Sequence, residues 1–188
     1  MRSHVTNFPA ERWSIGAPRS GSLPAKRLLA DIRKLAPQIR SRAEDIEATR
    51  RIPPSLVKTL RSIGVFRMVM PRSHGGFELD LPTVLEILTV LSKIDGSVGW
   101  TMAIASAGDL FVPLLPRDMY DEVYRTGPDV VLAGSSQPVG TAEATADGWR
   151  VTGRWPFASG YQHADWMLGM CGRRHGSNLH QRPPHDPR

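Results

Sequence analysis

The chain changes character at Pro128, and this change restricts its fold more than any other feature. Before it, apolar residues recur every three or four positions, as they do on the buried face of an α-helix. After it, short β-prone runs are separated by Gly, Pro and Asp-Gly. We therefore predict an α+β fold, with a helical domain over residues 22–127 and the start of a β-domain over residues 128–171.

The helical part has clear start and stop signals. Ser22-Leu-Pro24 supplies an N-cap and an early proline, and the apolar stripe that follows predicts one long helix through Ile46. A second helix should begin at Pro53-Pro54 and end at Gly64, followed by an extended run from Val65 to Met70. Further helices should follow Asp80, Val98 and Pro116.

The β-part contains four short runs, at residues 130–133, 142–145, 149–154 and 166–170. Asp147-Gly148 lies between two of them and is typical of a hairpin turn. These runs predict an incomplete, antiparallel, β-barrel-like middle domain. Residues 1–21 and 172–188 have no apolar period, and we expect a flexible N-terminus and a disordered tail.

Composition excludes several classes of protein. The net charge is +6, but the excess lies in the first 50 and the last 18 residues, so no basic face for nucleic acid is expected. There is no apolar run long enough to span a membrane and no signal peptide. Cys171 is the only cysteine, so a cytoplasmic location is expected. No histidine and cysteine set has metal-ligand spacing.

Two segments carry the residues that favour a ligand site. A flat ligand with apolar faces and a polar edge, such as a flavin, needs a wall and a set of hydrogen-bonding groups. Trp155, Phe157, Ala158 and Ser159 could supply the wall and one donor, and Ser135, Ser136 and Gln137 further polar groups. Alternatively, Trp155 and Phe157 fill a β-core and residues 135–138 form a turn.

Three motifs resemble those of acyl-CoA dehydrogenase-type flavoproteins. They are Gly64-Val-Phe-Arg-Met-Val-Met-Pro-Arg-Ser-His-Gly-Gly76, Asp95-Gly-Ser-Val-Gly-Trp100 and Asp147-Gly-Trp-Arg-Val-Thr-Gly-Arg-Trp-Pro-Phe-Ala-Ser-Gly160. The last two are most similar to the two-component flavin-dependent monooxygenases that hydroxylate phenols, including the steroid-ring phenol hydroxylases. The resemblance covers residues 22–170.

The resemblance implies a cofactor, partners and site residues. Reduced flavin, FAD or FMN, would come from a separate reductase and would activate dioxygen for transfer to a small aromatic substrate. Ser159 would lie near the flavin N5, Trp100 would line the pocket, and Ser135 and Ser136 would contact the flavin. Gly108 stands where some relatives carry an assisting histidine.

The resemblance also raises alternatives. The family continues into a C-terminal helical bundle that carries the catalytic histidine and builds a homotetramer, so the catalytic residues are unknown and we expect a truncated chain without monooxygenase activity. One alternative is an acyl-CoA dehydrogenase, although Ser-Gln-Pro138 replaces the more usual Thr-Glu-Pro. Another is a non-catalytic remnant. His74, His163 with Asp165, and His175, His180 and His185 are weaker candidates, and the last three are expected in a disordered tail.

Overall fold

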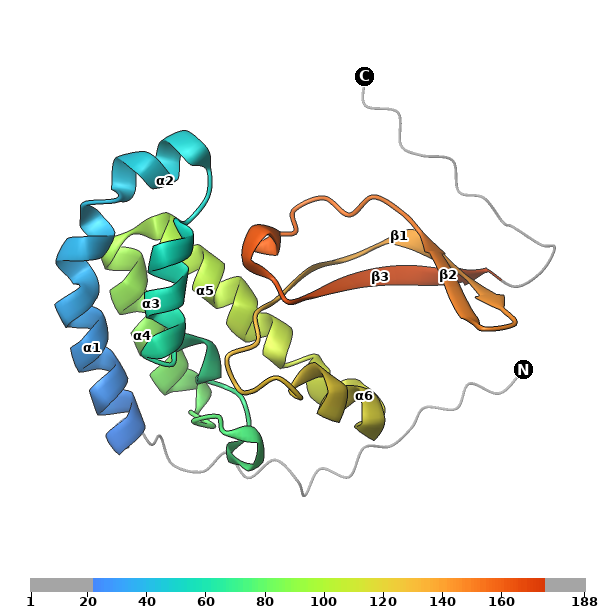
Figure 1. Cartoon of the computed structure of the whole chain (residues 1–188), viewed down its shortest axis with the longest axis horizontal. Coiled ribbons are helices and arrows are strands. Elements are labelled where there is room, and N and C mark those ends of the chain that lie inside the picture. The colour runs from blue at the N-terminus through green and yellow to red at the C-terminus, as the bar shows by residue number, and fades with distance from the viewer. Residues whose placement is uncertain (1–21, 175–188) are drawn as a thin grey trace.

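The computed structural model describes residues 22–174 as a helical bundle followed by a small sheet (Figure 1). The helices are α1 Leu23–Arg40, α2 Ala43–Thr49, α3 Pro54–Ser62, α4 Leu81–Ile94, α5 Gly96–Asp109 and α6 Arg117–Val123. Short 3-10 turns are η2 Val65–Arg67, η3 Arg72–His74, η4 Val112–Leu114 and η5 Tyr161–His163. The strands are β1 Leu132–Thr145, β2 Gly148–Thr152 and β3 Trp166–Arg174.

Helix α1 begins as predicted but ends earlier. The Ser22 hydroxyl accepts a hydrogen bond from the Ala25 amide, and a stripe of buried side chains faces the core. The helix stops at Arg40, and Ile46 belongs to the separate helix α2, so the single long helix was wrong. Pro37 lies inside α1, and the helix continues past it to Arg40, so the proline does not mark the break.

Helix α4 begins after Asp80 as predicted, whereas α5 begins at Gly96, two residues before the predicted start at Val98. The carboxylates of Asp80 and Asp95 cap them, each accepting from a backbone amide in the first turn at 2.9 Å. The segment predicted as extended is wrong over Val65–Arg67, which forms the 3-10 turn η2. Val65 and Phe66 in this turn are still buried, so the pattern identified burial but not backbone shape. No helix in the described part of the chain is both long and apolar enough to cross a bilayer.

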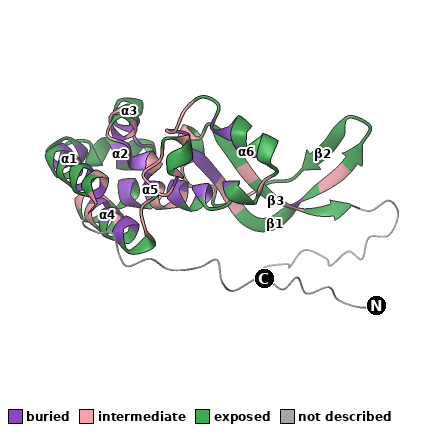
Figure 2. Cartoon of the chain, turned by 90° about the horizontal axis from the view of Figure 1, so that it is seen from below, coloured by how far each residue is buried: buried purple, intermediate pink, exposed green. Residues whose placement is uncertain are grey.

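The core lies in the helices and at the base of the sheet. Figure 2 shows buried residues through the bundle and at the start of β1, while the outer sheet is exposed. Helix α5 packs against both α4 and β1, which makes it the element that joins the two parts. Its C-terminal half therefore faces the sheet, and its N-terminal end is free for the loop that precedes β3.

The sheet is small, open and mixed, with the order β2-β1-β3. Strands β1 and β2 form the predicted antiparallel hairpin around Asp147-Gly148, whereas β3 runs parallel to β1. The α+β class is thus confirmed, but the purely antiparallel, barrel-like arrangement is wrong for β3. The runs at 130–133 and 142–145 belong largely to one long strand, with an irregularity between Ser135 and Gly140.

Strand β3 extends further than predicted. It continues to Arg174, whose guanidinium pairs with Glu143 at 3.3 Å, and Arg173 lies over the ring of Trp149. Backbone pairing with β1 and these two side-chain contacts extend the strand where the sequence alone showed no apolar alternation. The predicted flexible segment 1–21, the rest of the predicted tail, and His175, His180 and His185 lie outside the described residues.

Candidate functional site

A hydrogen bond between Trp100 and Ser159 joins α5 to the loop before β3. Trp100 lies near the N-terminus of α5, and its indole Nε1 donates to the Ser159 Oγ at 3.1 Å. An indole N–H can only donate, so the Ser159 oxygen must be the acceptor. The Ser159 hydroxyl proton therefore remains available to donate to a ligand.

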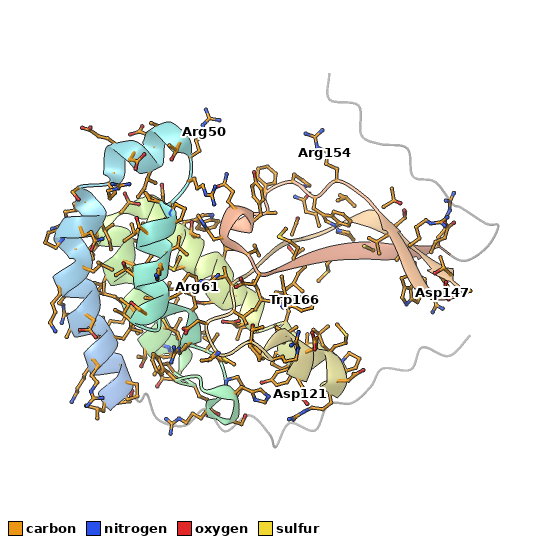
Figure 3. All side chains as sticks on the ribbon, viewed as in Figure 1. Arg50, Arg61, Asp121, Asp147, Arg154 and Trp166 are labelled. Atoms are coloured by element: carbon orange, nitrogen blue, oxygen red, sulfur yellow. The ribbon has the colours of Figure 1, made fainter. Side chains whose placement is uncertain are left out.

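The loop that carries Ser159 is tied to the helical part by charged groups. The Arg61 guanidinium on α3 donates to the Asp165 carboxylate at 2.8 Å and to the His163 carbonyl at 3.3 Å. Figure 3 shows Arg61 on the side of α3 that faces the sheet. The same Asp165 oxygen accepts from the Val131 amide at 2.8 Å. These contacts fix the C-terminal end of η5, and they leave Asp165 engaged with Arg61 and not with His163, the partner considered from the sequence.

Trp155 lies in the loop after β2, beyond the predicted run 149–154 and not on a strand as in the alternative β-core interpretation. Its indole Nε1 donates to the Met170 carbonyl at 2.9 Å, and its ring lies against Gly140, Gly153 and Gly169. A Cβ added at Gly140 would come within 2.2 Å of the ring atom Cζ2. The glycine at this position therefore lets the indole lie flat on the sheet.

The neighbouring residues are placed differently. Phe157 is 84% exposed and has a positive φ of 59°, an uncommon conformation for an aromatic residue. Ala158 is half-buried and accepts from the Tyr161 amide. The structure therefore brings Ser159 and Trp155 against other elements but turns Phe157 towards solvent.

An apolar cavity of about 390 Å³ lies between the C-terminal half of α5, η4 and the strands β1 and β3. Ser135 and Ser136 lie on its wall. Gln137 is exposed beside it, and the backbone amide of Gln137 donates to the Ser135 hydroxyl. Gly108 also lines it, and a Cβ there would come within 2.8 Å of the Leu132 Cβ. The absent side chain at position 108 therefore allows β1 to pack closely on α5. The cavity wall includes Ile104, Phe111, Leu114, Leu168 and Met170.

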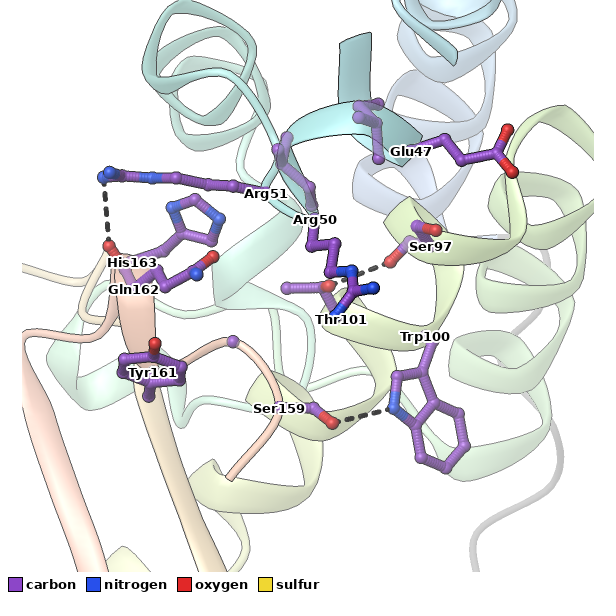
Figure 4. Close-up of a pocket in the computed structure, with 13 residues that line it drawn as sticks. Glu47, Arg50, Arg51, Ser97, Trp100, Thr101, Ser159, Tyr161, Gln162 and His163 are labelled. Carbon is purple, nitrogen blue, oxygen red and sulfur yellow. Dashed lines mark hydrogen bonds between the residues drawn. The ribbon is translucent and has the colours of Figure 1, made fainter. Parts of the chain in front are cut away.

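A second cavity, of about 480 Å³, has charged, polar and aromatic side chains on its wall and includes Ser159 (Figure 4). Its walls come from the α2–α3 connection, the N-terminal end of α5 and η5. Burial, together with the charges of Arg51 and Arg61, lowers the pKa of His163, so this imidazole is neutral at physiological pH. Trp100 and Ser159 line this cavity, while Ser135 and Ser136 line the other, so the predicted site residues fall into two groups.

Sequence reasoning missed a buried carboxyl group. Asp109, at the end of α5, is 6% exposed, and the Tyr124 hydroxyl lies 3.2 Å from its Oδ1. Burial raises the pKa of Asp109 to about 7, and the hydrogen bond from Tyr124 opposes this only partly. The spacing of Met102, Ala105 and Asp109 places all three on one face of α5, and this pattern could have revealed the burial.

His74 has a structural role. Its ring packs edge-on against Tyr120 with centroids 4.7 Å apart, and its Nε2 lies 3.2 Å from Asp121. Over residues 22–174 there is no group of three His, Cys, Asp or Glu side chains that could hold a metal ion.

Residues 25–115 match the model of the acyl-CoA dehydrogenase N-terminal domain. Over 145 residues the chain is 37% identical to the oxygenase component of an FADH2-dependent resorcinol hydroxylase from a Rhizobium species, covering 77% of this chain. It is 36% identical to an indole-3-acetate monooxygenase from Acinetobacter baumannii over 72% of this chain. The chain spans 36% and 35% of the lengths of these two relatives.

Solved structures agree with these relatives. The HsaA monooxygenase of Mycobacterium tuberculosis superimposes with a TM-score of 0.74 at 31% identity, covering 79% of this chain and 39% of that one. XiaF from a Streptomyces species, solved with FADH2 and glycerol, gives a TM-score of 0.78 at 29% identity, covering 82% and 39%.

Proposed function

We propose that this chain is part of the oxygenase component of a two-component flavin-dependent monooxygenase acting on small aromatic compounds, because residues 25–115 match the acyl-CoA dehydrogenase N-terminal domain and the relatives are named as such oxygenases. This proposal rests on the names of three relatives. One is the oxygenase component of a resorcinol hydroxylase, one is an indole-3-acetate monooxygenase, and HsaA is the oxygenase subunit of a flavin-dependent monooxygenase. An oxygenase component takes its reduced flavin from elsewhere, so the expected partner is a flavin reductase.

The residues present fit a flavin. The cavity beside α5 is apolar on most of its wall and carries the Ser135 and Ser136 hydroxyls, which suits a flat ring with a polar edge. Its volume of about 390 Å³ is within the usual range for a small-molecule site. We assign Ser135 and Ser136 to the flavin edge, and FAD is favoured over FMN because the resorcinol hydroxylase and XiaF are named with FADH2.

Ser159 and Trp100 would act together. When bound, reduced flavin supplies the electrons that activate dioxygen. Ser159 lines the other cavity, so a flavin on Ser135 and Ser136 would have to extend to the Ser159 loop; the Ser159 hydroxyl, its oxygen already accepting from Trp100, would then donate its proton in a hydrogen bond to the flavin. Trp100 is therefore a positioning residue for Ser159. The apolar wall of Ile104, Phe111 and Leu168 would keep water away from the reacting atoms.

Phe157 and Gln137 are assigned no direct flavin contact. Phe157 is turned to solvent and Gln137 is exposed on β1, and neither lines the two cavities. Trp155 lies on the sheet, and its hydrogen bond to the Met170 carbonyl would hold the loop that carries Ser159 against β3.

The proposal is tested by turnover. The protein is mixed with a flavin reductase, NADH, FAD and resorcinol or indole-3-acetate under ¹⁸O₂, and products are analysed by mass spectrometry. We expect one labelled oxygen atom in the hydroxylated product from a protein that carries these residues together with the C-terminal bundle of the relatives, and none from residues 1–188 alone, which span 36% of the resorcinol hydroxylase. Absence of labelled product with every aromatic substrate would count against the proposal. Oxidation of an acyl-CoA without any reductase would replace it with dehydrogenase chemistry.

A further inference from the structure

The 3-10 turn η5 is held to the helical bundle by arginine side chains that donate to its carbonyl groups. The Arg51 guanidinium donates to the Gln162 carbonyl at 3.3 Å, and the Arg61 guanidinium donates to the His163 carbonyl, also at 3.3 Å. Figure 4 shows the imidazole of His163 beside the Arg51 side chain. Two cations therefore hold this turn at the place where it carries a titratable side chain.

The charges around the His163 imidazole are mostly positive. The nearest carboxylate along the chain, Asp165, pairs with Arg61 at 2.8 Å, and among residues 22–174 no carboxylate pairs with the imidazole. Burial first, and then the charges of Arg51 and Arg61, lower the pKa of His163 from its ordinary 6.5. A proton on this ring would therefore stay uncompensated.

The other charged groups of the cavity do not change this balance. Arg50 also lines it, and Figure 4 shows its guanidinium pointing towards Ser97 and Thr101 on α5. Glu47 on α2 lines it too, but its carboxylate points away. Helix α5 contributes only uncharged side chains to the cavity wall.

Protonation of His163 would place a third positive charge beside two guanidinium groups. Like charges repel, and partial burial reduces the screening by salt. Because Arg51 and Arg61 are also the donors that hold η5, the repulsion opposes these contacts directly. The attached turn disfavours the proton, so its stability is complete above pH 6.5 and is lost as the pH falls below that value.

Backbone hydrogen bonds couple η5 to Ser159. The amides of Tyr161 and His163 donate to the carbonyls of Ala158 and Gly160, at 3.1 Å and 2.9 Å, on either side of Ser159. Gly160 lies close to α5, since a Cβ there would come within 3.3 Å of a side-chain carbon of that helix. A displacement of η5 therefore also moves Ser159 away from α5.

We propose that His163 is a positioning residue for Ser159: while its imidazole is neutral, η5 stays on Arg51 and Arg61, and protonation releases the Ser159 loop from α5. This inference rests on the proposed function only in its consequence, because a released Ser159 would no longer reach a flavin. The release itself is a property of the chain without any ligand.

Hydrogen–deuterium exchange of the whole chain without flavin tests the proposal. Mass spectrometry follows peptides within residues 157–165 at about pH 7.5 and about pH 5.5, where aspartates stay ionised, with rates corrected for intrinsic exchange. We expect amide protection in this segment to fall at least about threefold at the lower pH, while peptides of α1 keep theirs. Equal protection of the segment at both pH values would overturn the proposal.

A pair of histidine variants separates charge from structure. His163→Gln cannot take up a proton, and we expect its protection to change by less than about 1.5-fold between the two pH values. His74→Gln removes the other described histidine, on η3, and should show the same loss as the parent. Circular dichroism of both variants checks folding. A loss in folded His163→Gln as large as that in the parent would contradict the proposal.

Arg51→Gln keeps the proposal testable if His163→Gln does not fold. It removes one of the two charges that act on the imidazole, so we expect a smaller loss of protection at low pH than in the parent. An equal loss would contradict the role of this arginine. Because neither flavin nor substrate is present in these measurements, failure here is distinguishable from failure of the proposed function.

Discussion

The Arg61 guanidinium on α3 donates to the Asp165 carboxylate at 2.8 Å, across 104 positions of the sequence. Asp165 also accepts from the Val131 amide, so one carboxylate holds the end of the Ser159 loop both to the bundle and to the start of β1. The site described above depends on this connection, because Ser159 reaches Trp100 only while the loop stays against α5.

Breaking this contact should loosen the loop more than it destabilises the fold. Both side chains are about one third exposed, so we expect Arg61→Gln to lower the free energy of unfolding by only about 1 kcal/mol. Limited proteolysis within residues 153–165 should become clearly faster. Arg125→Gln, which removes an exposed pair with Glu122, is the control and should change neither measurement. Unchanged proteolysis in Arg61→Gln would show that other contacts hold the loop.

Asp109 should make stability depend on pH. Burial raises its pKa from 3.8 to about 7 in the folded chain, so the folded state binds the proton more tightly than the unfolded state. The resulting stability is complete below about pH 4 and is lost as pH rises towards 7, by at most about 4 kcal/mol.

Asp109→Asn should remove most of this dependence, because an amide stays neutral and can still accept from Tyr124. Urea unfolding at several pH values between about 4 and 8 measures the effect. We expect the variant to be more stable than the parent at pH 8. Glu86→Gln on the exposed side of α4 is the matched control. An equal slope in the parent and Asp109→Asn proteins would mean that Asp109 is ionised when folded.

Gly140 should be required for the position of Trp155. A methyl group there would meet the indole at 2.2 Å, so Gly140→Ala must displace the ring and weaken its bond to the Met170 carbonyl. We expect a loss of about 1–3 kcal/mol in unfolding free energy. Gly172→Ala is a control on the neighbouring strand, since the nearest atom to its Cβ is 4.0 Å away. Similar losses in both variants would indicate a general effect of strand glycines.

The sequence predicted local structure well and long-range structure poorly. Capping residues such as Asp80 and Asp95 act within one helical turn, so their helices could be located from the sequence. The pairing of β1 with β3 joins residues about 30 positions apart, and nothing in either strand specifies a parallel partner. Long-range contacts also determine how the predicted site residues are divided between the two cavities. Trp100 meets Ser159 through the tertiary contact between Arg61 and Asp165, which the sequence does not reveal.

Binding of reduced flavin tests the central claim most directly. Equilibrium dialysis of the protein against reduced FAD under strict anaerobiosis gives a dissociation constant without any turnover. We expect saturable binding, a loss of about tenfold or more in Ser159→Ala from the missing hydrogen bond, and a smaller loss in Trp100→Phe, which keeps the ring but not the donor. Ser62→Ala, at an exposed hydroxyl on α3, should bind as the parent does. Equal affinity of the parent, Ser159→Ala and Trp100→Phe proteins would contradict the assignment of this loop to the flavin.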